Sequence, residues 1–176
     1  RRQCRRRRRG LGGVDGVELD AIGPALSRAS SAARGGANAA PLADLLDRLR
    51  GIHQEHEQLF VLHATVLRGM GRHDEAIAVA NAQFAAAPTW RSAVTAANTL
   101  RAAGRLEDAL AHYEEASKLD PDSAATELDI GDLCMFLGLL PRADAAYHAA
   151  RERGATGPWV DAALALVAYK LEPSLQ

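Results

Sequence analysis

Apolar residues recur along this chain at the spacing of α-helices. One stripe, between residues 41 and 50, is formed by Leu42, Leu45, Leu46 and Leu49. Spacings of 3, 4 and 7 place these side chains on one face of a helix. From about His53 the pattern becomes regular, and the next stripe is formed by Leu59, Leu62, Val66 and Met70. The pattern therefore predicts one helix at about 41–50 and another that starts near residue 53.

Glycine and proline mark where the predicted helices end. Gly71 ends the helix that starts near residue 53, because glycine tolerates the left-handed backbone of a helix C-terminus. Asp74 can cap the next helix, which stops before Pro88. Further helices are expected at about 91–103, 106–119, 124–137, 141–153 and 159–171, with Ser123 as a cap and Pro141 in a first turn. The chain is thus predicted to be all-α.

A glycine, an alanine and a proline return at a nearly fixed distance along the chain. The set formed by Gly71, Ala76 and Pro88 returns once in full, and its first two members return a second time: Gly104, Ala109 and Pro121, then Gly138 and Ala143. The period of about 34 residues is typical of stacked helical hairpins. Such hairpins contact only their neighbours and build an elongated solenoid with a groove.

On these residues the chain resembles the tetratricopeptide repeat family. Residues 90–123 carry the most matches to its 34-residue pattern of small and aromatic residues: Ala97, Gly104, Ala109, Tyr113, Ala116 and Pro121. The neighbouring repeats depart from the pattern at Ala80, Gln83 and Ala155, and residues 90–123 depart from it at Ala93 and Ala96. The resemblance implies a helical domain at 37–176, with repeats at about 57–89, 90–123 and 124–157 and a capping helix at about 158–171.

In this family the first helix of each repeat lines a concave groove. The matching positions are Gln58, Val61, Thr65 and Arg68 in the first repeat, Arg91, Val94, Asn98 and Arg101 in the second, and Ala125, Leu128, Asp132 and Met135 in the third. The groove is expected to be basic in its first two repeats and acidic at Asp132, with Glu127 and Asp129 nearby. Such a surface suits an extended peptide or a partner helix. Residues 14–50, or a second copy of the chain, are alternative occupants.

One known mode of the family is not expected. Repeats that hold the C-terminal carboxylate of heat-shock chaperones have lysine, asparagine and arginine at five groove positions. Here those positions are occupied by Val61, Thr65, Thr95, Ala125 and Asp129. None of these side chains is of the required kind, so the sequence argues against a carboxylate clamp.

The charge is divided unevenly along the chain. The net charge is −1, yet seven of the first nine residues are arginine, and the remaining 14 basic and 22 acidic residues leave residues 10–176 at about −8. Residues 1–36 are predicted to be a basic, disordered or irregular leader. Its arginines could tether nucleic-acid phosphates. No aromatic residue is interleaved with them, however, and a remnant of an altered reading frame explains the run equally well.

Candidate chemistry is sparse. His53, His56 and His63 are predicted to share one helix, which permits a metal site, although an incidental or structural role is favoured. Cys134 is predicted to be a buried, inert thiol, whereas Cys4 lies among arginines that would lower its pKa. Trp159 is either a partner contact or a lid on the third repeat, with the lid favoured. The sequence has no catalytic constellation, and no cofactor or metal is expected.

These observations favour a non-enzymatic cytoplasmic adaptor that holds a protein or peptide in its groove. The short apolar runs argue against a membrane helix, and the composition hints at a bacterial source. Two alternatives stay open. The chain is the repeat portion of a larger bacterial enzyme such as a transferase, or it is tethered to nucleic acid through its leader. A homo-oligomer is compatible with each reading.

Overall fold

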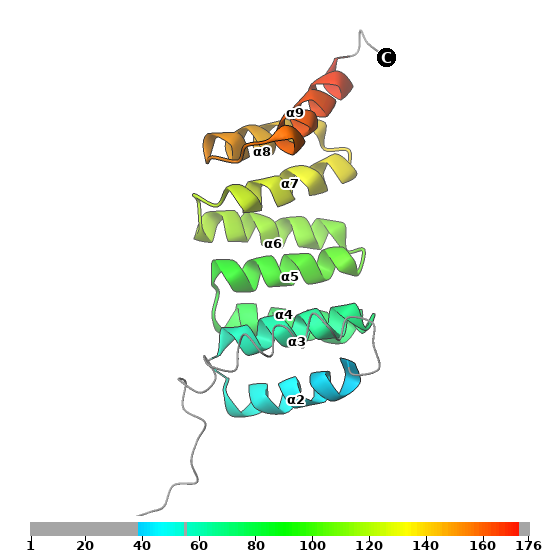
Figure 1. Cartoon of the computed structure of the whole chain (residues 1–176), viewed down its shortest axis with the longest axis vertical. Coiled ribbons are helices and arrows are strands. Elements are labelled where there is room, and N and C mark those ends of the chain that lie inside the picture. The colour runs from blue at the N-terminus through cyan, green and yellow to red at the C-terminus, as the bar shows by residue number, and fades with distance from the viewer. Residues whose placement is uncertain (1–38, 55, 173–176) are drawn as a thin grey trace, which may run out of the picture.

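The computed structural model describes residues 39–54 and 56–172, and within them it contains helices and no strand. The helices are α2 (Ala39–Ile52), α3 (Glu57–Gly69), α4 (His73–Ala86), α5 (Trp90–Ala102), α6 (Leu106–Leu119), α7 (Ala124–Phe136), α8 (Leu140–Glu152) and α9 (Pro158–Leu171). They stack along the long axis of the molecule in chain order (Figure 1). The predicted all-α repeat solenoid is confirmed. The basic leader and Cys4 lie outside the described residues.

Each hairpin turns at a glycine with a left-handed backbone. Gly71, Gly104 and Gly138 have φ values of +74°, +78° and +74°. The amide of the residue after each glycine donates to a carbonyl in the last turn of the preceding helix, at 3.0 Å from Arg72 to Leu67, 2.9 Å from Arg105 to Leu100 and 2.8 Å from Leu139 to Cys134. This is the helix-end geometry that glycine permits without strain. The three glycines therefore mark equivalent corners of successive repeats, as the period predicted.

Small residues allow the paired helices to approach closely. Ala64, Ala76, Ala97, Ala109 and Ala143 are completely buried where the helices meet. Larger side chains fill the space around these contacts. In the second repeat, where Ala93 and Ala96 stand in place of larger residues, Leu100, Leu110 and Tyr113 are all buried.

Several helix ends fall where the sequence placed them, and two do not. The Ser123 side chain accepts from the Thr126 amide, and Pro141 lies in the first turn of α8, both as predicted. The prediction that Asp74 caps its helix is wrong: α4 begins at His73, and the Asp74 carboxylate lies in the first turn. In this position the negative carboxylate still interacts favourably with the positive end of the helix dipole.

The helix predicted from about residue 53 begins later, at Glu57. His56 has an extended backbone with φ −88° and ψ 91°, and the His53 amide donates to the Leu49 carbonyl at 2.9 Å. His53 thus closes the end of α2, and the prediction that three histidines share one helix is wrong. The pattern of buried positions does not reveal this break between α2 and α3, because His53 before it and Leu59 after it are both buried.

The two ends of the array are also formed by repeat helices. Ala43 of α2 is buried and lies one repeat period before Ala76, so α2 occupies the place of a second helix of a repeat. At the other end, α9 covers α8 with Val160, Ala163, Leu164 and Val167. Its first residue, Pro158, lies one repeat period after Ala124, the first residue of α7. The helix α9 is therefore in register with the first helices of the repeats.

Candidate binding groove

The predicted groove residues avoid the core. All twelve positions, from Gln58 to Met135, are half-buried or exposed, whereas other positions of the same helices, such as Leu59, Ala97 and Leu133, are buried. Val94, Leu128 and Met135 pack against the edge of the core cluster, and Thr65 turns its hydroxyl back to the Val61 carbonyl at 2.7 Å. The described residues are thus compatible with one continuous lining on α3, α5 and α7, which remains a prediction.

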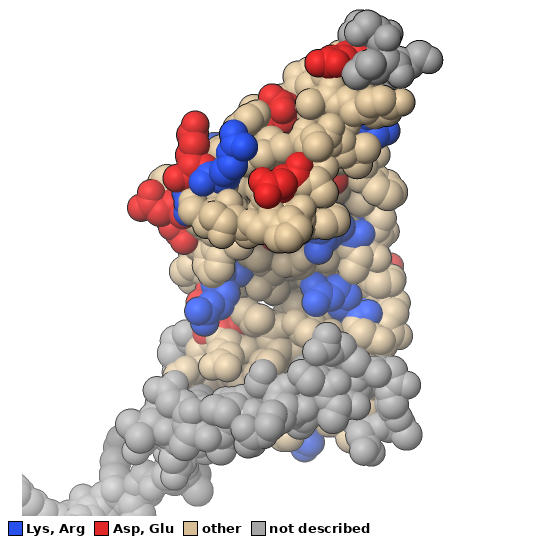
Figure 2. Space-filling model, turned by 45° about the horizontal axis from the view of Figure 1, so that its top comes forward, with Lys and Arg blue, Asp and Glu red and all other residues tan. Residues whose placement is uncertain are grey.

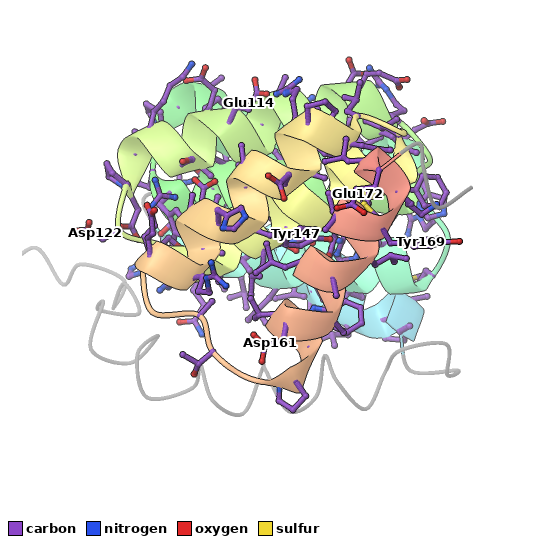
Figure 3. All side chains as sticks on the ribbon, turned by 90° about the horizontal axis from the view of Figure 1, so that it is seen from above. Glu114, Asp122, Tyr147, Asp161, Tyr169 and Glu172 are labelled. Atoms are coloured by element: carbon purple, nitrogen blue, oxygen red, sulfur yellow. The ribbon has the colours of Figure 1, made fainter. Side chains whose placement is uncertain are left out.

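The same four positions continue onto α9, where the sequence analysis considered only Trp159, as a possible partner contact. Counting from Pro158 as for the other first helices places Trp159, Ala162, Leu166 and Tyr169 there. The first three line a cavity between α7 and α9, and Trp159 is 64% exposed. Tyr169 lies at the far end of the helix (Figure 3). The repeat period could have predicted these positions, because it extends to Pro158 at the start of α9. The third repeat lacks the proline that ends the first two, which hides this continuation.

This α7–α9 cavity has a volume of about 430 Å³ and is mainly apolar. Its remaining lining residues are Asp132, Met135, Phe136, Tyr147 and Ala163. Phe136 projects with 77% of its surface exposed, although the sequence analysis did not place it in the groove. A second cavity of about 340 Å³ adjoins the first and shares Asp132 and Phe136 with it, while Arg101, Leu106 and Leu133 complete it. The structure therefore brings three predicted groove residues, Arg101, Asp132 and Met135, to one linked depression.

Figure 2 shows a hollow in this region, with basic side chains beside it and a mostly uncharged surface above it. Ala162 and Leu166 of α9 are apolar lining residues of the first cavity. The charged lining is confined to Asp132 in the first cavity and to Arg101 and Asp132 in the second. The depression is thus apolar, with one carboxylate common to both of its parts.

A tyrosine holds the polar groove residue in two successive repeats. The Tyr113 hydroxyl donates to Asn98 Oδ1 at 2.9 Å, and the Tyr147 hydroxyl donates to Asp132 Oδ1 at 2.7 Å. Burial raises the pKa of Tyr113 to about 12. The pKa of Tyr147 is also raised, by burial and then by the hydrogen bond to Asp132. Both tyrosines therefore stay protonated at neutral pH and act as fixed donors.

Arg101 does not present a free positive charge to the groove. Its guanidinium donates to Asn98 Oδ1 at 3.1 Å, lies 3.6 Å from Asp129 Oδ1, and lies over the Tyr113 ring with 6.0 Å between the guanidinium carbon and the ring centroid. Burial raises the pKa of Asp129, Arg101 lowers it, and Asp132 raises it further. The expectation of a basic groove thus holds less well near Arg101, whose charge is balanced by Asp129.

Glu127 belongs to the packing between repeats and not to the groove. It is buried, it accepts from the Ser117 hydroxyl at 2.5 Å, and it pairs with Arg153. Trp90 has a similar structural role, because its indole N–H donates to Thr126 Oγ1 at 2.8 Å. The expected neighbourhood of acidic residues around Asp132 is thus reduced to Asp129.

The other candidate residues have structural positions. The His53 and His56 rings meet edge to face with centroids 5.8 Å apart, whereas His63 is buried in α3, and burial lowers its pKa. Within the described residues no three histidine, cysteine, aspartate or glutamate side chains gather as a metal site would require. Cys134 is buried as predicted, and burial raises the pKa of its thiol. Trp159 is 64% exposed and lines the α7–α9 cavity, so the choice between a lid and a partner contact stays a prediction.

Comparison with known proteins bears on the resemblance to the repeat family. The family profile described as "TPR repeat" matches residues 97–135. Residues 97–135 therefore carry tetratricopeptide repeat sequence. No curated protein matches it. Among the helices of 39–54 and 56–172, none has both the length and the apolar character of a membrane span.

Solved structures with tetratricopeptide repeats share this fold. The Yersinia enterocolitica type III secretion chaperone SycD, in complex with a peptide of the translocator YopD, aligns with a TM-score of 0.59 and 18% identity over 64% of this chain and 92% of that one. The repeat protein TTC0263 of Thermus thermophilus aligns with a TM-score of 0.62 and 18% identity over 85% and 82%. A tetratricopeptide repeat protein of Parabacteroides merdae aligns with a TM-score of 0.65 and 17% identity over 86% and 60%. The TM-scores show that this chain and the three proteins share a fold.

Proposed function

We propose that this protein is a non-enzymatic interaction scaffold that binds an extended peptide or a partner helix along α3, α5, α7 and α9. The observation that carries the proposal is the linked depression at the α5–α7–α9 end, which opens beside the polar positions of the repeats. Apolar cavities with a few placed polar groups are the usual form of binding sites in proteins. The helical domain that would carry this groove extends over about 37–176.

The fold also supports this proposal by analogy. SycD, which shares the repeat architecture, is in complex with a peptide. Fold alone does not fix function, so the proposal depends on the groove residues of this chain. Its first half offers polar groups such as Gln58 and Arg91, and its second half offers apolar ones such as Leu128 and Met135. A peptide with polar and apolar ends would match both halves.

The experiment is a selection of random dodecapeptides displayed on phage, with the whole chain as bait. Arg91→Glu, Ala125→Glu and Leu128→Glu each change a groove position that is not fully buried. We expect each to weaken the selected peptides by about tenfold, because a central contact typically contributes more than about 1 kcal/mol. Asn98 is left unchanged, since its loss would strand the Tyr113 hydroxyl.

The matched controls are Ala111→Glu and Ala145→Glu, which add the same charge at exposed positions of the second helices α6 and α8. Their peptide affinity should equal that of the parent chain. The proposal would be refuted if groove and control variants lost the same peptide affinity. It would also be refuted if the three groove variants bound the peptides as tightly as the parent chain does. Circular dichroism and thermal unfolding show whether each variant is folded.

A further inference from the structure

The α7–α9 cavity joins an apolar wall with a single carboxylate. Trp159, Phe136 and Leu166 supply exposed apolar surface, and Asp132 is the charged residue of the lining. We propose that this cavity binds the side chain of a lysine or arginine of the partner, with its cationic group at Asp132. This inference names the chemistry of the occupant and rests on the proposed peptide-binding function.

The carboxylate of Asp132 decides against a purely apolar occupant. One of its oxygens accepts from Tyr147, and the side chain remains half-buried in the free protein. A leucine or methionine packed over it would remove water from the charge and offer no hydrogen bond in return, which is costly. A guanidinium or ammonium group would instead form a charge-assisted hydrogen bond.

The balance of charge around the cavity also favours a cation. Asp129 and Asp132 lie on the same helix, and their electrostatic repulsion contributes to the raised pKa of Asp129. Arg101 pairs with Asp129 at 3.6 Å, so it balances one of the two carboxylates. Asp132, the carboxylate that both cavities share, lies at their junction. An acidic side chain would be repelled there, and a basic one would be attracted.

The aromatic wall suits the rest of a basic side chain. Lysine and arginine carry a long apolar stem before the charged group, and such stems pack on apolar surfaces. Met135, Ala162 and Leu166 can contact the stem. Trp159 and Phe136 also line the cavity, and with 64% and 77% of their surface exposed they can contact the stem as well. Binding of the side chain would bury these two rings, which are exposed in the described residues.

The first test uses small probes in place of an unknown partner. Butylguanidinium is compared with butylurea, a neutral molecule of nearly the same shape, in titrations of the whole chain followed by NMR. The readout is the indole N–H resonance of Trp159, assigned with Trp159→Phe. We expect butylguanidinium to bind at millimolar concentration and butylurea to bind at least about tenfold more weakly. Equal binding of the two probes, or no shift with either, would overturn the proposal.

The decisive variant is Asp132→Asn, which removes the charge and keeps an oxygen that can accept from Tyr147. The second repeat already folds with asparagine in this place, since Asn98 accepts from Tyr113. We expect the preference for butylguanidinium to disappear in this variant. The matched control is Asp161→Asn near the start of α9 (Figure 3), which removes one carboxylate that does not line the cavity. It should keep the preference, and a preference that survives in Asp132→Asn would contradict the proposal.

A second arm separates this inference from the proposed function. In peptides selected on the whole chain, each lysine or arginine is replaced in turn by norleucine, which keeps the stem and loses the charge. We expect one replacement to weaken binding at least about tenfold in the parent chain and to have little effect in Asp132→Asn. Groove-dependent peptides that tolerate every replacement would refute the cation site and leave the groove intact. Selective butylguanidinium binding without any groove-dependent peptide would support the cavity and refute the proposed function.

Discussion

The second and third repeats form the same hydrogen bond with acceptors of different charge. In both, a buried tyrosine of the second helix donates to a side chain 15 residues earlier on the first helix. The acceptor is the neutral Asn98 in the second repeat and the carboxylate Asp132 in the third. Arg101 also donates to Asn98, whereas Asp132 borders both cavities. Where the second helix carries the tyrosine, the first helix therefore supplies an acceptor, but the charge of this acceptor differs and can serve binding.

The two repeats also differ where their helices approach each other. Ala97 is completely buried in the second repeat, and its counterpart in the third is Gly131. A Cβ atom on Gly131 would lie 2.6 Å from Tyr147 Cε1. The Tyr147 ring thus lies against the backbone of α7, where the glycine leaves room for it. The third repeat gives up a methyl group and positions the ring that holds Asp132.

The largest effect is expected from Gly131→Ala. The added methyl group would overlap a buried ring that cannot move without disturbing its bond to Asp132. We expect a loss of about 3 kcal/mol in the free energy of unfolding, at the upper end of the usual cost of overpacking. Urea unfolding measures it. In Gly131→Ala with Tyr147→Leu the two changes should cost clearly less than their separate sum, and strict additivity would argue against the close contact.

A smaller effect is expected from removing each tyrosine hydroxyl. Tyr147→Phe takes a hydrogen bond from a carboxylate and should cost about 2 kcal/mol, whereas Tyr113→Phe takes one from an amide and should cost about 1 kcal/mol. Asn98 keeps the Arg101 donor in the second case. Chemical denaturation of the two variants under identical conditions tests the order. A larger loss in Tyr113→Phe would show that charge does not distinguish the two bonds.

At neutral pH the raised pKa of Tyr113 has no effect on stability, but in alkali it should. The unfolded phenol ionises near its ordinary pKa of about 10, while the folded one resists ionisation up to about 12. Between these values the unfolded state loses a proton that the folded state keeps, so stability must fall as the pH rises. Unfolding at pH 9 and pH 11 measures the fall, and Tyr113→Phe should reduce it. An unchanged fall in that variant would assign the effect to other groups.

The smallest effect on stability is expected from Asn98→Asp, which gives the second repeat the acceptor of the third. The new carboxylate can accept from Tyr113 and from Arg101, so we expect a change within about 0.5 kcal/mol. Thermal unfolding checks this. A loss several times larger would mean that the repeat tolerates only a neutral acceptor, which would contradict the freedom of charge inferred from the comparison.

The sequence predicted the corners and the register of the repeats, because glycine and alanine at fixed distances follow from backbone conformation and close packing. Gly104 is an example of the backbone conformation, and Ala109 is an example of the close packing. The sequence did not predict the α7–α9 cavity, since this depends on Phe136, which lies outside the repeat positions of the groove, and on the placement of α9. The pairing of Arg101 with Asp129 was also missed. It joins side chains of two different repeats, whose separation in space the period alone does not give.

The most direct measurement is amide chemical-shift mapping of the whole chain with a selected peptide. If the groove is the binding surface, the changes will concentrate on α3, α5, α7 and α9 and will include residues around Asp132 and Trp159. Changes confined to the exposed faces of α4, α6 and α8, around residues such as Ala111 and Ala145, would contradict it.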